Sequence, residues 1–183
     1  DTARSRGLGD VYKRQMHKRS NLGIKYLPQE PSIFQNLTVY ENLFGLAELT
    51  FKNNNDIKTS VEKLLDEFDL IEIRDLKGRQ LSGGQRRKVE IARTLVSNPK
   101  MILLDEPFAG IDPIAIEEIK KVLNTLKNKG IGILITDHNV RETLEICDHA
   151  AIINNGEIIA HGTKENLISN QVVKDVYLGN MYN

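Results

Sequence analysis

The chain has 183 residues, a length that suits one domain with a hydrophobic core of its own. Lys plus Arg and Asp plus Glu each number 25, so the sequence lacks the basic excess typical of nucleic-acid-binding proteins. No stretch approaches the roughly 18 consecutive apolar residues that span a bilayer, and the single cysteine, Cys147, excludes an internal disulfide and fits a reducing cytosol.

Residues 1–15 differ in character from the rest of the chain. They show neither apolar periodicity nor the hydrophobic region of a signal peptide, and Gly7 and Gly9 interrupt any helix. We predict that this segment is foreign or disordered sequence joined to a truncated gene. A divergent natural N-terminus is the alternative.

From Asn21 onward, strand-like and helix-like segments alternate, which predicts an α/β fold with a mainly parallel sheet. Apolar runs predict strands at 23–27, 101–104 and 131–136, the second of them buried on both faces. Apolar residues at intervals of three and four predict helices at 39–47, 57–70, 86–96, 114–128 and 140–147. The dipeptide Asn155-Gly156 predicts a hairpin turn between strands 151–154 and 157–160, and the tail 163–182 is predicted to be helical.

The segment Leu-Ser-Gly-Gly-Gln at 81–85, the signature segment, precedes the predicted helix 86–96. It offers a hydroxyl group, two backbone positions without Cβ and the N–H groups of a helix start, all of which suit contact with an anion such as phosphate. A Gly-Gly turn alone is usually only a helix cap. The phosphate-binding interpretation is supported because a predicted helix and an acidic strand end follow the segment.

Two carboxylates, Asp105 and Glu106, end the apolar strand at 101–104. Ligands and catalytic groups collect at the carboxyl ends of strands in open parallel sheets. An acidic pair there needs a compensating cation, and Mg²⁺ bound to nucleotide phosphates is the obvious candidate. The alternative is an acidic loop that only caps a helix beginning near Pro107.

The signature segment followed by Ile-Leu-Leu-Asp-Glu-Pro at 102–107 resembles the ATP-binding subunits of ABC transporters. The resemblance implies a P-loop NTPase fold of the ABC ATPase type, with a helical subdomain at about 33–97. The phosphate-binding loop G-x-x-x-x-G-K-[ST] that the family carries upstream occurs nowhere in the 183 residues. We therefore interpret residues 16–183 as a partial nucleotide-binding domain that lacks its N-terminal lobe.

The resemblance implies ATP and Mg²⁺ as cofactors and assigns roles to individual residues. Asp105 would hold Mg²⁺, Glu106 would polarise the attacking water, and Gln29 would touch both. His138 would contact the γ-phosphate as the switch histidine, although a lone histidine is more often structural.

The family's signature segment binds ATP held by an opposite subunit, which implies a head-to-tail homodimer. The residues that carry this role here are Leu81, Ser82, Gly83, Gly84 and Gln85. Asp112 matches the loop that crosses the dimer interface, and it also has the position of a helix N-cap before Pro113.

Longer strings resemble the ATPase subunits of the lipopolysaccharide export (Lpt) systems of Gram-negative bacteria. They are Glu-Pro-Ser-Ile-Phe at 30–34, Thr-Asp-His-Asn-Val-Arg-Glu-Thr-Leu at 136–144 and Val-Tyr-Leu-Gly at 176–179. This likeness implies an ATP hydrolase that lies in the cytoplasm, peripheral to the inner membrane, and does not itself insert into it. Its helical region would dock coupling helices of the membrane subunits through Phe34 and Phe44, whose alternative role is in the subdomain core.

Three alternatives remain at this point. ATPases of branched-chain amino-acid importers share the Ala-Gly-x-Asp-Pro segment, found here at 109–113. ATPase heads of chromosome-maintenance proteins adjoin long heptad coiled coils, and the sequence shows no sustained heptad run. The third alternative is a non-catalytic fragment, because a chain without the phosphate loop is expected neither to hydrolyse ATP alone nor to fold robustly.

Overall fold

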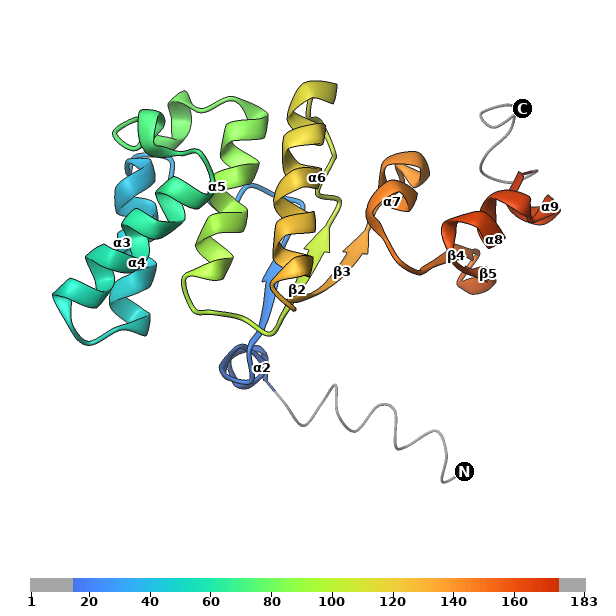
Figure 1. Ribbon diagram of the computed structural model, residues 1–183, viewed down its shortest axis with the longest axis horizontal. Coiled ribbons are helices and arrows are strands. Elements are labelled where there is room, and N and C mark those ends of the chain that lie inside the picture. Colours follow the sequence, from blue (N-terminus) through green and yellow to red (C-terminus); the bar gives the residue numbers. More distant parts are fainter. Residues whose placement is uncertain (1–14, 175–183) are drawn as a thin grey trace. The chain divides into compact units, whose positions relative to one another are not determined.

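The computed structural model describes residues 15–174 (Figure 1), so the predictions for 1–14 and for the end of the tail lie outside the described residues. The chain forms two compact units, Asp1–Thr136 and Asp137–Asn183, and each is described by itself. Within the described part of the chain, no helix is both long and apolar enough to span a bilayer.

A three-stranded parallel sheet organises the first unit. It contains β1 (Ile24–Leu27), β2 (Met101–Asp105) and β3 (Gly132–Thr136), in the order β1-β2-β3. Leu27 pairs with Leu104, and Asp105 pairs with Thr136. Because all three strands run the same way, their carboxyl ends meet at one edge of the sheet. The parallel α/β fold predicted from the sequence is confirmed.

Two helices lie side by side against this sheet, α5 (Gly83–Leu95) on β1 and α6 (Pro113–Asn128) on β3 (Figure 1). Along β2, Ile102 and Leu104 are buried while Leu103 is only partly so. On β3, Leu134 is 53% exposed. The prediction that β2 is buried on both faces is therefore wrong for the described residues, where alternate side chains remain accessible to solvent.

Helices α3 (Val39–Thr50) and α4 (Asn54–Glu67) of the first unit pack against each other, and each begins at a capping residue. Thr38 caps α3 in a reciprocal box with Glu41, and Asn53 caps α4. Ser82 forms the same box with Gln85, so α5 begins three residues before the predicted start. Short elements complete the unit: α2 (Met16–Asn21), which the sequence pattern did not predict, and the 3-10 turns η1 (Ile71–Ile73) and η2 (Gly78–Gln80).

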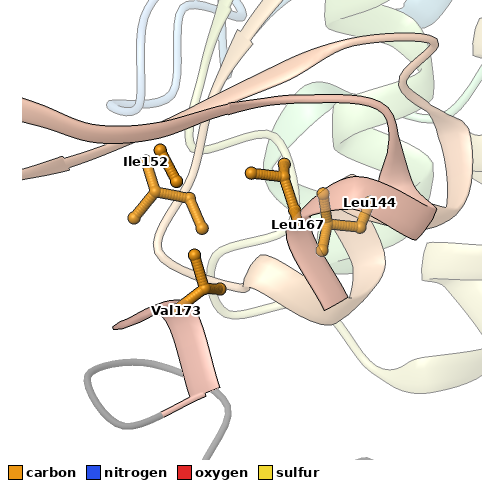
Figure 2. Close-up of a cluster of buried hydrophobic side chains, with 5 residues drawn as sticks. Leu144, Ile152, Leu167 and Val173 are labelled. Carbon is orange, nitrogen blue, oxygen red and sulfur yellow. The ribbon is translucent and has the colours of Figure 1, made fainter. Parts of the chain in front are cut away.

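The second unit is a hairpin with short helices. It contains α7 (Val140–Ile146), β4 (Ala150–Asn154), β5 (Glu157–Gly162), α8 (Lys164–Ser169) and α9 (Gln171–Val173). Asn155 and Gly156 have φ angles of 50° and 83°, which confirms the predicted turn. Its small core consists of apolar side chains that converge from both strands and three helices (Figure 2), namely Leu144, Ile152, Ala160, Leu167 and Val173.

Candidate functional site

Two of the predicted catalytic residues meet at the carboxyl edge of the parallel sheet. Gln29 lies two residues beyond β1 and Glu106 directly follows β2. The Gln29 Nε2 donates to Oε2 of Glu106 at 2.7 Å. The parallel pairing of β1 with β2 therefore places an amide and a carboxylate, which are 77 residues apart in the chain, in direct contact.

The carboxylate of Asp105 accepts a hydrogen bond at each of its oxygens. Thr136 Oγ1 donates to Oδ1 at 2.6 Å, and Tyr26 OH donates to Oδ2 at 3.0 Å. These bonds hold the pKa of Asp105 below its ordinary value because they favour the charged form, and the bond from Thr136 has the larger effect. The bond from Tyr26 also raises the pKa of that tyrosine. An aspartate kept ionised in this way fits the hard oxygen ligands that Mg²⁺ prefers.

Sequence reasoning missed both Tyr26 and Thr136. Thr136 on β3 pairs directly with Asp105 on β2, and Tyr26 on β1 pairs with Leu103 on β2. The sequence signal would have been a hydroxyl residue at the end of one strand that pairs with an aspartate at the end of its neighbour. This pairing can be recognised only after the register of the strands is known.

Removing both hydroxyl donors is expected to raise the pKa of Asp105 towards the 3.8 of an unperturbed aspartate. The substitutions are Tyr26→Phe with Thr136→Val, and carboxyl ¹³C NMR during an acid titration measures the result. Because the folded pKa lies below the unfolded one, the ionised carboxylate stabilises the fold above the unfolded pKa, and this contribution disappears as the pH falls through the folded pKa. A pKa unchanged by the double substitution would contradict the assignment of these donors.

Glu106 has an unusual backbone conformation, with a φ angle of 42°. This left-handed region is uncommon for a residue with a long side chain and costs conformational energy. The backbone N–H of Glu106 donates to the carbonyl of Thr136 at 2.7 Å, and its carbonyl accepts from Ala109 N–H at 3.2 Å. These bonds hold the turn that aims the Glu106 side chain at Gln29.

The signature segment divides into an outward and an inward half. Ser82 and Gly83 are exposed, whereas Leu81 is 5% exposed and Gly84 is buried. A Cβ added at Gly84 would lie 2.3 Å from the Cβ of Ala115 on α6. Ser82 and Gly83 are thus the members accessible to solvent, while Leu81 and Gly84 pack α5 into the fold.

Gln85 and Asp112 both act as helix caps. The Oε1 of Gln85 accepts from Ser82 N–H at 3.0 Å, and Oδ1 of Asp112 accepts from Ala115 N–H at 3.0 Å. The predicted N-cap role of Asp112 is confirmed. Gln85 and Asp112 also line one surface hollow together with Ser82, so the structure brings these three predicted residues together.

His138 belongs to the second unit and lies two residues beyond the end of β3. Its side chain is 74% exposed, and its Nδ1 lies 3.8 Å from Oδ1 of Asp137. Its role as the switch histidine stays a prediction.

Comparisons with known proteins show which family the chain resembles. The family model described as "ABC transporter" matches residues 5–109. The chain is 52% identical over 174 residues to the lipopolysaccharide export system ATP-binding protein LptB of Haemophilus influenzae, covering 94% of this chain and 72% of that protein. It is 48% identical over 171 residues to LptB of Escherichia coli K12, covering 93% and 71%.

Solved structures of ATP-binding cassettes share the fold. MJ1267 in its ADP conformation, an ATP-binding cassette of an ABC transporter, aligns with a TM-score of 0.76 at 34% identity, covering 91% of this chain and 72% of that chain. The cbiO1 protein of Clostridium perfringens, part of the ABC transporter complex cbiONQ, aligns with a TM-score of 0.77 at 28% identity, covering 91% and 68%.

Proposed function

We propose that this chain, which belongs to the ABC transporter family, is the ATP-binding subunit of a lipopolysaccharide exporter. In this role it would couple ATP hydrolysis to extraction of lipopolysaccharide from the inner membrane. The ATPase proposal rests on the contact between Gln29 and Glu106 beside the ionised Asp105. The names of the Haemophilus and Escherichia relatives support the choice of transported lipid.

The proposed chemistry gives each strand-end residue one task. Asp105 would hold Mg²⁺, which when bound neutralises charge that develops on the phosphates. Glu106 polarises the attacking water by accepting a hydrogen bond from it. Gln29 donates to the same carboxylate and so orients Glu106 towards the water.

A head-to-tail homodimer would complete the site. Ser82 and Gly83 are exposed at the start of the 13-residue helix α5, where backbone N–H groups favour an anion. Ser82 shares its surface hollow with Asp112, the residue expected at the subunit interface. We propose that this surface contacts ATP bound to a second copy of the chain, and that His138 contacts the γ-phosphate in its own subunit.

ATP binding and hydrolysis test this function. The 183-residue chain is compared with a loop-restored chain, in which residues 16–183 follow a segment that carries the phosphate-binding loop G-x-x-x-x-G-K-[ST] expected of the family. We expect only the loop-restored chain to bind and hydrolyse ATP, because the phosphate loop supplies the backbone cradle for the phosphates. An inactive loop-restored chain would contradict the function. Tight binding by the 183-residue chain alone would instead place the phosphate cradle elsewhere and overturn the roles given to Gly83, Asp105 and His138.

The transported substrate needs a separate experiment. The loop-restored chain is expressed in Escherichia coli depleted of its own LptB, and lipopolysaccharide export is measured. Restored export supports the proposed substrate. A chain that hydrolyses ATP but supports only uptake of branched-chain amino acids, in a strain lacking that importer's ATPase, would favour the importer alternative.

Phe34 is the stronger of the two candidate docking residues. Its side chain is 56% exposed, and the guanidinium of Arg93 lies 4.9 Å from its ring centroid. Phe44 is half-buried and stacks on Tyr40 with ring centroids 5.7 Å apart. We propose that Phe34 contacts a coupling helix of the membrane subunits, which would place the protein at the cytoplasmic face of the inner membrane.

Replacing Phe34 by Ala is expected to weaken copurification with the membrane subunits by about tenfold or more, as truncation of a buried aromatic anchor does. The Leu49→Ala variant is the matched control, since Leu49 is an apolar residue of α3 that is 84% exposed. Intact assembly in the Phe34 variant would count against docking at this position.

A further inference from the structure

One buried guanidinium joins the two chain segments that carry the catalytic pair. Arg87 lies on α5 and is 5% exposed. Its Nη1 donates to the carbonyl of Pro28 at 2.9 Å, and its Nη2 donates to the carbonyl of Asp105 at 2.9 Å. Pro28 immediately precedes Gln29, and Asp105 immediately precedes Glu106. Arg87 therefore holds the backbone directly before each member of the pair.

Glu90, one turn later on the same helix, contacts the loop on the other side of Gln29. Glu90 is 3% exposed and pairs with Arg87, with 3.2 Å between Oε2 and Nη1. Its other oxygen, Oε1, accepts from the backbone N–H of Ser32 at 2.8 Å. The loop that carries Gln29 is thus tied to α5 on both sides of that residue.

The geometry of these bonds suits an arginine. The two terminal nitrogens of Arg87 form a planar fork, and each nitrogen contacts a carbonyl of a different segment, whereas an ammonium group would have to reach both carbonyls from one nitrogen. The Nε of Arg87 is buried and has no hydrogen-bond partner among the described residues. A buried N–H without a partner is unfavourable. The contacts with the two carbonyls and with Glu90 therefore determine where the guanidinium lies, although they leave Nε unpaired.

We propose that Arg87 is a positioning residue for ATP hydrolysis, which sets Gln29 against Glu106 and links that pair to the helix that begins at the signature segment. Arg87 lies about one turn after Gly83 on α5. A ligand that contacts Ser82 or Gly83 would therefore touch the same helix that holds the strand ends in place. This inference rests on the proposed ATPase function.

The expected signature is a loss of turnover without a loss of ATP affinity. Gln29 and Glu106 act on the attacking water, which matters in the transition state more than in the bound ground state. A displacement of about 1 Å in such groups lowers rates by about 100-fold. Weakening the Arg87 contacts should therefore lower kcat and kcat/KM together while KM for MgATP changes little.

The test compares Arg87→Lys with Lys120→Gln in the loop-restored chain. Lys120 is also buried and forms an ion pair of 2.9 Å, but its partner is Glu117 on its own helix, α6, rather than the strand ends. We expect Arg87→Lys to lower kcat by about 10- to 100-fold with KM changed less than about twofold. Lys120→Gln should lower the Tm while kcat is retained.

Equal loss of Tm in the two variants with kcat retained in both would overturn the proposal. If Arg87→Lys does not fold, Glu90→Gln replaces it, because it removes the charge that holds Arg87 while leaving an acceptor for Ser32 N–H. An unchanged kcat in Glu90→Gln then overturns the proposal. Absence of turnover in the unsubstituted loop-restored chain would instead contradict the ATPase function itself.

Discussion

Replacing Glu106 by Gln in the loop-restored chain is expected to lower ATP turnover by about 10²–10⁴-fold, the usual contribution of a general base. The amide keeps the length of the side chain and an oxygen that can accept from Gln29, whose Nε2 lies 2.7 Å from the carboxylate. The negative charge that polarises water is lost. ATP binding should therefore persist, and phosphate release measured beside nucleotide binding separates the two effects.

The control for this variant is Glu48→Gln, which removes an exposed carboxylate on α3. It should leave turnover unchanged. Turnover in the Glu106 variant equal to that of the control would show that another residue polarises the water, and the role given to Glu106 would be wrong.

The second large effect is structural and concerns Gly84. A Cβ at this position would lie 2.3 Å from the Cβ of Ala115, so Gly84→Ala must push α5 and α6 apart. We expect a loss of about 1–3 kcal/mol in the free energy of unfolding, as overpacking of a core costs. This loss should appear even though alanine favours helices over glycine by up to about 1 kcal/mol. Denaturant unfolding of the loop-restored chain measures it.

Two further variants isolate the contact. In Gly83→Ala the added Cβ would meet, within residues 15–174, only the Gly110 carbonyl at 3.6 Å, an ordinary contact, so stability should be retained. The double variant Gly84→Ala with Ala115→Gly removes the clash from the other side and should recover stability, which a double-mutant cycle reports as coupling. No recovery in the double variant would contradict the proposed helix contact.

Gly83→Ala also carries a functional expectation. Because Gly83 is exposed at the start of α5, a methyl group there would stand where the proposed ATP contact forms. In Gly83→Ala, turnover should fall while the free energy of unfolding is retained. In Gly84→Ala, the free energy of unfolding itself should fall. The two neighbouring glycines thus separate ligand contact from packing.

Local patterns in the sequence were enough to predict the α/β class, the strand that ends at the acidic pair and the Asn155-Gly156 turn. Each depends on residues within a few positions of one another, such as an apolar run followed by carboxylates. Helix starts were less accurate. The start of α5 was missed because the Ser82 and Gln85 caps extend it beyond its apolar periodicity.

The contacts within the site depend on the tertiary structure. Gln29 and Glu106 are 77 residues apart, Tyr26 and Asp105 are 79 apart, and Thr136 and Asp105 are 31 apart. Only the register of three parallel strands brings these side chains together, and the sequence of a single strand does not specify its neighbour. The positive φ of Glu106 likewise reflects hydrogen bonds from other segments. The residue types of the site could therefore be read from the chain, whereas their partners followed from long-range packing.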